Sequence, residues 1–234
     1  MNNALKNLGY SLSQLFFPQL CAGCGSDIID KEQIICLHCN EQLPVTNFHL
    51  HANNPVEKIF WGRLPVTAAA SLLYFTKNSV LQQLLHQFKY KGNKEIGYFL
   101  GRQMGNAFIQ SNRFCHADAL IALPLFPSKE RKRGYNQAAV LCEGFSDATG
   151  IPFLPKAVAR RVYTDTQTHK NRIERWQNME GKFVLEDEAA ISNKRIILID
   201  DVITTGATLE ACGHELLKAS GVQLNIASLA YTSS

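Results

Sequence analysis

The most informative stretch of the chain runs Arg195-Ile-Ile-Leu-Ile-Asp-Asp-Val-Ile-Thr-Thr-Gly-Ala-Thr208. Its four consecutive apolar residues, Ile196–Ile199, predict a buried strand. Two adjacent carboxylates, a Thr-Thr-Gly turn and a helical pattern over Ala207–Ala219 follow this strand. Because ligands bind just beyond the carboxyl ends of the strands in open α/β sheets, the segment predicts a ligand site there.

The residues after the predicted strand indicate which ligand the site would hold. The turn offers backbone N–H groups, threonine hydroxyls and the positive end of a helix dipole, which favour a phosphate, and Gly206 lets the backbone approach it. Asp200 and Asp201 would repel a phosphate, so we expect them to bind sugar hydroxyls or to lie near a divalent cation. Ribose 5-phosphate satisfies both halves of the segment. The alternative is an ordinary turn preceded by a capping acid and a surface acid.

Strands and helices alternate along most of the chain. Further strands are predicted at Val66–Phe75, Ala119–Leu123, Ala157–Tyr163 and Val222–Tyr231. Helices are predicted over Val80–Phe88, from Ile96 to Phe108 and over Asn136–Thr149, with a turn at Lys89–Gly92. This order predicts an α/β fold, in which a parallel sheet is covered by helices on both faces.

Four of the seven cysteines form two C-x-x-C pairs near the N-terminus, at Cys21, Cys24, Cys36 and Cys39. Two such turns facing each other provide the tetrahedral S₄ shell of a structural Zn²⁺ site. Two disulfides or a redox-active pair are the alternatives, but a chain without an export signal is expected in a reducing compartment. His38 is expected to be an exposed spacer, and the other three cysteines to be small buried residues.

The chain is expected to divide into three parts: an N-terminal zinc module over residues 1–45, a linker over 46–65 and an α/β domain over 66–234. Residues 3–17 carry leucines at helical spacing and predict a short amphipathic helix. His49 and His51 lie in the polar part of the linker and are expected to be solvated.

The composition of the 234 residues is close to the globular average, with a formal net charge of +4. It excludes collagen-like, disordered and coiled-coil classes, and no apolar run is long enough for membrane insertion. With no convincing secretory signal, the chain is expected to be cytoplasmic. The charge is too small to indicate nucleic-acid binding by itself, although Lys129, Arg131, Lys132 and Arg133 form one basic cluster.

Several motifs together resemble a known family. The segment around Asp200 resembles the phosphoribosyl-diphosphate (PRPP) motif of type I phosphoribosyltransferases. Leu123-Pro124-Leu125 and the later Arg133-Gly134-Tyr135-Asn136-Gln137-Ala138 are similar to the P-x-P…R-G-[FY]-N-Q-A signature of the ComF/GntX family. Tyr90-Lys91-Gly92 matches that family's Y-K-G element, and Thr164–Gly181 follows its T-x-x-Q…R…N…G pattern, with Thr166 where many members have Ser. The four-cysteine module is the family's usual companion.

The resemblance implies a type I phosphoribosyltransferase fold that binds PRPP, generally with Mg²⁺. Asp200 and Asp201 would be the catalytic carboxylates on the ribose hydroxyls. The implied PRPP-binding residues are these two together with Val202, Ile203, Thr204, Thr205, Gly206, Ala207, Thr208, Arg133, Lys129 and Lys89. Residues 164–180, with Gln167, Arg172 and Arg175, correspond to a flexible loop that closes over PRPP. A disordered surface loop is the alternative for that segment.

Two classes of function remain open at this stage. The first is a phosphoribosyltransferase, in which a nucleophile displaces pyrophosphate from the ribose C1. No sequence feature identifies the acceptor. The second is a module that keeps the PRPP site for sensing, or that binds single-stranded DNA or proteins of the DNA-uptake machinery, since the family is linked to natural competence. Tyr135 and Trp176 are aromatic residues that could stack on a base in that role.

Overall fold

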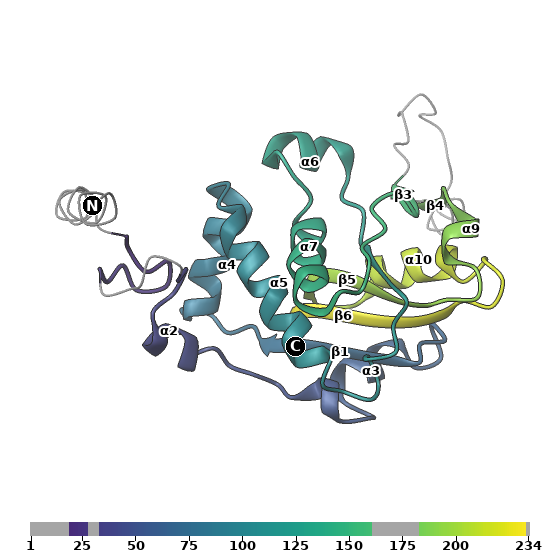
Figure 1. Ribbon diagram of the computed structural model, residues 1–234, viewed down its shortest axis with the longest axis horizontal. Helices are drawn as coiled ribbons and strands as arrows, with labels where there is room; N and C mark the ends of the chain where they lie inside the picture. Colours follow the sequence, from purple (N-terminus) through teal and green to yellow (C-terminus); the bar gives the residue numbers. More distant parts are fainter. Residues whose placement is uncertain (1–18, 28–32, 161–182, 233–234) are drawn as a thin grey trace, which may run out of the picture.

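The computed structural model describes residues 19–27, 33–160 and 183–232. At its centre is a four-stranded sheet with the order β1-β6-β5-β2, all parallel (Figure 1). Its strands are β1 (Ala68–Tyr74), β2 (Ala119–Ala122), β5 (Arg195–Ile203) and β6 (Gln223–Tyr231). The α/β fold and the four principal strands predicted from the sequence are therefore confirmed. The sequences of the core strands are largely apolar because both faces of the sheet are covered.

The helices between β1 and β2, and the one after β2, cover one face of the sheet. They are α4 (Val80–Tyr90), α5 (Lys94–Phe108) and α7 (Gln137–Thr149). Glycines let α5 and α7 approach closely: a Cβ at Gly101 would lie 2.3 Å from the carbonyl oxygen of Leu141, and one at Gly144 would lie 2.1 Å from that of Tyr98. Lys89 and Tyr90 belong to the last turn of α4, so the turn predicted at Lys89–Gly92 begins only at Lys91.

The opposite face carries α10 (Ala207–Leu216) and α3 (Pro55–Phe60). The crossovers from β1 to β2 and from β5 to β6 run in opposite directions across the sheet, so right-handed connections place α5 and α10 on opposite faces. Leu64, just after α3, packs on α10, since a Cβ at Gly213 would lie 2.6 Å from Leu64 Cδ2.

The linker was expected to be solvated. This was wrong for His49 and for the side chains of α3 that are buried in the core. Val56 and Phe60 of α3 are fully buried, and His49, in the short 3₁₀ helix η1 (Phe48–Leu50), is 5% exposed and stacks on Phe108. Burial and the neighbouring His51 lower the pKa of His49. Asn54 caps α3 through the N–H groups of Val56 and Glu57, which explains why this polar stretch folds.

A second, smaller sheet pairs β3 (Val158–Arg160) with β4 (Phe183–Leu185) in antiparallel fashion. The strand predicted at Ala157–Tyr163 is therefore present over Val158–Arg160 but lies outside the main sheet, and residues 161–163 are beyond the described part. Residues 152–154 instead extend the main sheet beside β2, through Leu120 N–H to Pro152 O and Leu154 N–H to Leu120 O, both 2.9 Å. The short α9 (Glu188–Ile191) leads from β4 into β5.

The cysteine-bearing segment lies at one end of the molecule, beside α4, and includes the five-residue α2 (Leu37–Glu41) (Figure 1). Residues 44–46 then run antiparallel to the outer edge of β1, with Thr46 N–H donating to Leu72 O at 2.9 Å and Tyr74 N–H to Pro44 O at 2.8 Å. Gln87 of α4 donates to the Ala22 carbonyl at 2.6 Å. These bonds join the cysteine segment to the α/β body.

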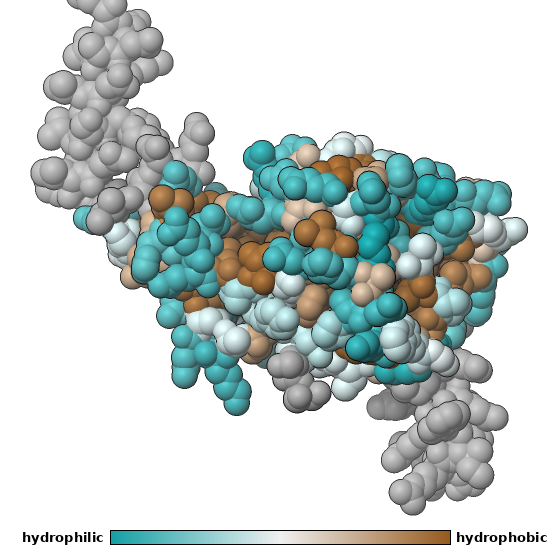
Figure 2. Space-filling view, turned by 90° about the horizontal axis from the view of Figure 1, so that it is seen from below, coloured by the Kyte–Doolittle hydropathy of each residue, from teal (hydrophilic) through white to brown (hydrophobic). Residues whose placement is uncertain are grey.

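The surface mixes polar and apolar side chains, as on the face shown in Figure 2. Within residues 19–27, 33–160 and 183–232, the most exposed large apolar residue is Leu37 of α2, at 69%. No helix among the described residues has the length and apolar character needed to cross a bilayer.

Candidate functional site

The segment that carries the predicted chemistry begins inside β5 rather than after it. The predicted strand ended at Ile199, but β5 continues through Ile203 because β6 pairs with it up to the Ile203–Tyr231 position. On the other side, β2 pairs with β5 only as far as Ile199. Asp200 and Asp201 therefore lie where one edge of β5 is no longer paired with β2.

The two adjacent carboxylates lie in a charged environment. Asp201 Oδ2 forms a salt bridge of 2.8 Å with Lys89 Nζ, and both side chains are largely buried. The Asp201 N–H donates to Asp200 Oδ1 at 2.8 Å. Burial, reinforced by the charge of Asp201, raises the pKa of Asp200 to about 7, although Lys89 and Arg160 oppose the shift. Near neutral pH Asp200 can take up or release a proton when a ligand binds.

Arg160, at the end of β3, is a neighbour of Asp200 that the sequence analysis missed. Its guanidinium lies 3.5 Å from the ring centroid of Phe126 and 5.1 Å from that of Phe183. Its buried Nε has no hydrogen-bond partner among the described residues, and burial lowers its pKa while Asp200 opposes the shift. Arg160 contacts Phe126 after β2 and Phe183 of β4, both distant in the sequence, so no local pattern could have identified it.

The turn after β5 forms a small hollow at the N-terminus of α10. Its volume is about 50 Å³, and its lining consists of Asp200 and residues 202–209. Thr204, Thr205 and Thr208 are exposed, whereas Gly206 is buried with a φ of +71°. Backbone N–H groups, hydroxyls and the N-terminus of a ten-residue helix thus converge on one hollow, which has the chemistry to hold a phosphate.

The basic cluster of Lys129, Arg131, Lys132 and Arg133 lies on a helix, α6 (Pro127–Arg133), that stands out from the body in Figure 1. Pro127 at its first position and Gly134 with a φ of +83° at its end explain why this short segment is helical. Lys129 is exposed on α6. Arg133 is half-buried, donates to Gln137 at 2.6 Å and lies 5.7 Å from the ring of Tyr90. The structure therefore brings Arg133 to the end of α4, where Lys89 also lies.

Tyr135 cannot stack on a base as the sequence suggested. It is 7% exposed, its ring packs on Phe88, and its hydroxyl donates to the Phe88 carbonyl. The exposed aromatic residue next to Arg133 is Tyr90, at 67%. Trp176 and the predicted loop residues Gln167, Arg172 and Arg175 lie outside the described residues, as does the helix predicted at 3–17.

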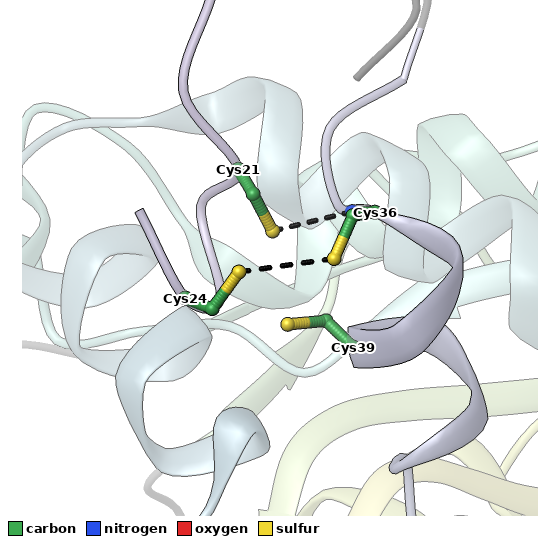
Figure 3. Close-up of side chains that lie close together, drawn as sticks. All are labelled: Cys21, Cys24, Cys36 and Cys39. Carbon is green, nitrogen blue, oxygen red and sulfur yellow. Dashed lines mark hydrogen bonds between the residues drawn. The ribbon is translucent and has the colours of Figure 1, made fainter. Parts of the chain in front are cut away.

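The four predicted metal ligands converge in the N-terminal segment. The Sγ atoms of Cys21, Cys24, Cys36 and Cys39 all lie within 4.8 Å of one another (Figure 3). The Cys24–Cys36 separation is 3.8 Å, which equals the edge of a tetrahedron with Zn–S bonds of about 2.3 Å. Gly23 is needed here because a Cβ would lie 2.7 Å from Cys39 Sγ. The geometry of the four thiols therefore fits a zinc ion.

Backbone N–H groups favour the thiolate form of Cys21, which is the form that binds a metal. Its sulfur accepts hydrogen bonds from Gly23 N–H at 3.3 Å and Cys36 N–H at 3.2 Å. Burial raises its pKa, but hydrogen bonds from the N–H groups of Cys36, Cys24 and Gly23 outweigh it and bring the pKa to about 6. Elsewhere in the described residues, Cys142 and Cys212 are buried as expected, while Cys115 is only partly buried.

The sequence of this chain is similar to those of several known proteins. A model of the phosphoribosyl transferase domain matches residues 138–234, which include β5, the hollow and α10. Competence protein F of Haemophilus influenzae is 31% identical over 209 residues, or 87% of this chain and 86% of that protein. The DNA utilization protein YhgH of Escherichia coli is 28% identical over 88% of each chain.

A shorter match is found in competence protein ComFC of Bacillus subtilis, which is 31% identical over 62% of this chain and 56% of that protein. Solved phosphoribosyltransferases superimpose too loosely to add to these matches. One of them is an adenine phosphoribosyltransferase from Thermoanaerobacter pseudethanolicus, with 13% identity, 75% and 98% of the two chains covered and a TM-score of 0.38. On the sequence matches, the chain belongs to the competence protein F (ComF) family and carries a phosphoribosyltransferase domain of the type I fold.

Proposed function

We propose that this protein binds PRPP, with the ribose hydroxyls on Asp200 and Asp201 and the 5-phosphate in the hollow of Thr204–Thr208. The observation that carries the proposal is that one continuous segment presents a carboxylate pair and an anion-binding turn side by side at the open edge of β5. A sugar with a vicinal diol next to a phosphate matches both groups. Val202 and Ile203 would join these two halves of the site.

The residues present can perform the binding without a covalent nucleophile. Ribose hydroxyls would donate to the carboxylate oxygens, which favours the ionised form of Asp200 and releases its proton. Lys89 would hold Asp201 in place through its salt bridge. The N–H groups of the turn and the first turn of α10 would donate to the phosphate oxygens. Binding thus depends on prearranged donors and acceptors.

The diphosphate of PRPP would lie toward the segment after β2, where Arg133 and Lys129 of α6 supply positive charge. Mg²⁺ would neutralise part of the diphosphate charge, and carboxylate oxygens such as those of Asp200 suit it as ligands. If an acceptor is bound, the protein would be a phosphoribosyltransferase of the pentosyl-transferring class, with Asp200 and Asp201 as its catalytic carboxylates. The loop residues Gln167, Arg172 and Arg175 would then exclude water.

Calorimetric titration with PRPP and Mg²⁺ tests this site. The double variant Asp200→Asn plus Asp201→Asn keeps the shape of both side chains and should lose at least about 100-fold in affinity, since each lost charged hydrogen bond costs about 1.5–3 kcal/mol. Asp147→Asn, on the exposed side of α7, is the matched control and should bind as the wild type does. Equal affinities in all three proteins would refute the site.

We also propose that the cysteine cluster holds a structural Zn²⁺. Four sulfur ligands fill the tetrahedral shell and leave no open position for a substrate, so the ion would stabilise the fold. Elemental analysis of the full-length protein should find one zinc per chain. A protein that contains no metal and still has its native far-UV and near-UV spectra would contradict this assignment.

The names of the relatives suggest the biological setting. One relative is named competence protein F and another DNA utilization protein, so both names refer to the handling of DNA or to competence. We propose that this chain acts in DNA uptake during natural transformation, in the cytoplasm. Incubation with PRPP, Mg²⁺ and a panel of bases would show whether pyrophosphate is released in an acceptor-dependent way, and binding without turnover would favour a sensing module.

A second candidate function is binding of single-stranded DNA or of a protein of the uptake machinery. One observation favours the DNA: exposed Tyr90 lies beside Arg133, next to the cations of α6 and 5.2 Å from the ring of His86. Stacking on an aromatic ring next to cations is how single strands are bound without sequence preference. Tyr90→Ala should then weaken oligonucleotide binding about tenfold, and the affinity should fall steeply with salt. Salt-independent binding or an unaffected variant would argue against it.

A further inference from the structure

The phosphate-binding hollow is supported by a helix that lies far from it in the sequence. A Cβ built on Gly206 would lie 2.7 Å from Ile59 Cγ2 and 3.0 Å from the Phe60 ring, both in α3. Phe60 is fully buried, so it cannot move aside without cost. The backbone of the turn therefore rests directly on α3, in the segment that the sequence suggested was a linker.

Arg63, three residues after α3, ties this support to the turn. Its Nη1 donates to the carbonyl oxygens of Ile59 at 3.2 Å and of Thr205 at 3.1 Å. Its Nη2 forms a salt bridge with Glu210 in the first turn of α10. One guanidinium thus connects α3, the turn and the helix whose N-terminus forms the hollow.

The bond to Thr205 controls the direction of an amide group that would face the phosphate. In a trans peptide unit the carbonyl and the N–H of the next residue point to opposite sides. When Arg63 holds the Thr205 carbonyl, the Gly206 N–H must point away from Arg63. Gly206 is itself one of the residues that line the hollow, so the orientation of this amide affects the wall of the hollow.

Arg63 also alters the electrostatics of the hollow. Glu210 carries a negative charge in the first turn of α10, where it would repel a bound phosphate. The salt bridge with Arg63 compensates that charge, and the two side chains are 40% and 24% exposed, so solvent screens the pair only in part. Both effects of Arg63 favour an anion at the same place.

We propose that Arg63 is a positioning residue for the phosphate-binding turn. It fixes the Thr205–Gly206 peptide so that its N–H faces the ligand, and it does so without touching the ligand itself. This inference rests on the proposed function, because it concerns the same turn and the same 5-phosphate.

The test compares two ligands in the full-length protein by calorimetry. Ribose 5-phosphate carries the phosphate that the turn would hold, whereas inorganic pyrophosphate carries only the part expected near Arg133. Arg63→Ala should bind ribose 5-phosphate about tenfold more weakly, because the turn must then be ordered at the expense of binding free energy and Glu210 is no longer neutralised. Its affinity for pyrophosphate should stay within about twofold of the wild type.

Three companion proteins complete the experiment. Glu210→Gln should bind ribose 5-phosphate no more weakly than the wild type, because it keeps the Thr205 bond and removes the repelling charge. Arg63→Lys should restore part of the lost affinity, since an ammonium can still donate to the carbonyl. Arg102→Ala breaks a comparable ion pair with Asp147, between α5 and α7, and should change neither affinity.

Hydrogen exchange provides a readout that needs no ligand. Arg63→Ala should speed exchange in the peptide that covers residues 204–210 and leave β6 unchanged. Parallel losses of ribose 5-phosphate and pyrophosphate affinity, or unchanged exchange in the turn, would overturn the positioning role. Failure of the wild type to bind either ligand would instead overturn the proposed function, and this inference with it.

Discussion

The cysteine cluster and the β5–α10 site differ in where their support comes from. The cluster takes all four sulfur atoms from nineteen residues of chain, Cys21–Cys39, and Gly23 and Cys36 supply the backbone N–H groups that bond to sulfur. The β5–α10 site takes its carboxylates and turn from one segment but depends on Lys89, Arg63 and Arg160, which come from three other parts of the chain.

This difference indicates how each region should fail when it is altered. A locally built metal site depends on its own ligands, so its loss should leave the sheet intact. A site assembled from distant elements is sensitive to packing changes that touch no ligand. The following predictions test that contrast.

Removal of one metal ligand should have the largest effect. Cys39→Ser should abolish zinc binding, since structural zinc contributes about 10–16 kcal/mol in small zinc modules. Proteolysis should then cleave residues 19–43 readily while β5 and β6 stay protected. Cys115→Ser, outside the cluster, is the control and should keep its metal. Unfolding of the sheet together with the module would contradict the contrast.

A methyl group on Gly206 should damage the second site without touching a ligand. Gly206→Ala adds positive-φ strain to the clash with Ile59 and Phe60 and should cost about 3 kcal/mol of unfolding free energy. Gly150→Ala shares a positive φ but meets nothing within 4 Å, so it should cost only about 1 kcal/mol. Chemical denaturation measures both. Equal losses would mean that α3 does not constrain the turn.

The pKa of Asp200 is raised, so replacement of its carboxyl group by a neutral side chain should stabilise the fold. The gain in unfolding free energy should depend on pH. Burial and Asp201 raise this pKa from 3.8 to about 7, so the folded state holds the proton more tightly than the unfolded state. The associated stability is present below pH 3.8 and is lost as the pH rises to about 7. Asp200→Asn should therefore be more stable than the wild type at pH 8, by about 2–4 kcal/mol, with little gain at pH 4. Urea denaturation at both values checks this, with Asp147→Asn as the control. A gain of equal size at both pH values would contradict it.

The smallest expected effect concerns the attachment of the cysteine module to the body. Gln87→Ala removes the 2.6 Å bond to the Ala22 carbonyl and should cost about 1 kcal/mol. Faster hydrogen exchange should appear in residues 19–27 but not in the β5–α10 turn. Gln83→Ala, on the same helix, is the matched control. Exchange that rises in both regions would show that the two depend on each other.

Local patterns predicted most of the main sheet and both clusters of chemistry-bearing residues. The run Ile196–Ile199 indicated a buried strand because apolar side chains on both faces need cover, and the spacing of Cys21 and Cys24 indicated a metal site because two ligands in one tight turn share one side. The prediction of a linker failed because His49 and α3 gain burial from β1 and α5, which local polarity does not reveal.

What the sequence by itself determined is therefore which chemical groups lie together locally: four thiols in two tight turns, and two carboxylates followed by a threonine turn on one strand. Tertiary structure alone decided the neighbours of those residues. Arg63 meets Thr205 across 142 positions of the chain, and Arg160 interacts electrostatically with Asp200 although 39 residues separate them in the sequence. The reason is physical: short-range spacing sets which groups share a turn, whereas burial and sheet pairing set which distant groups share a site.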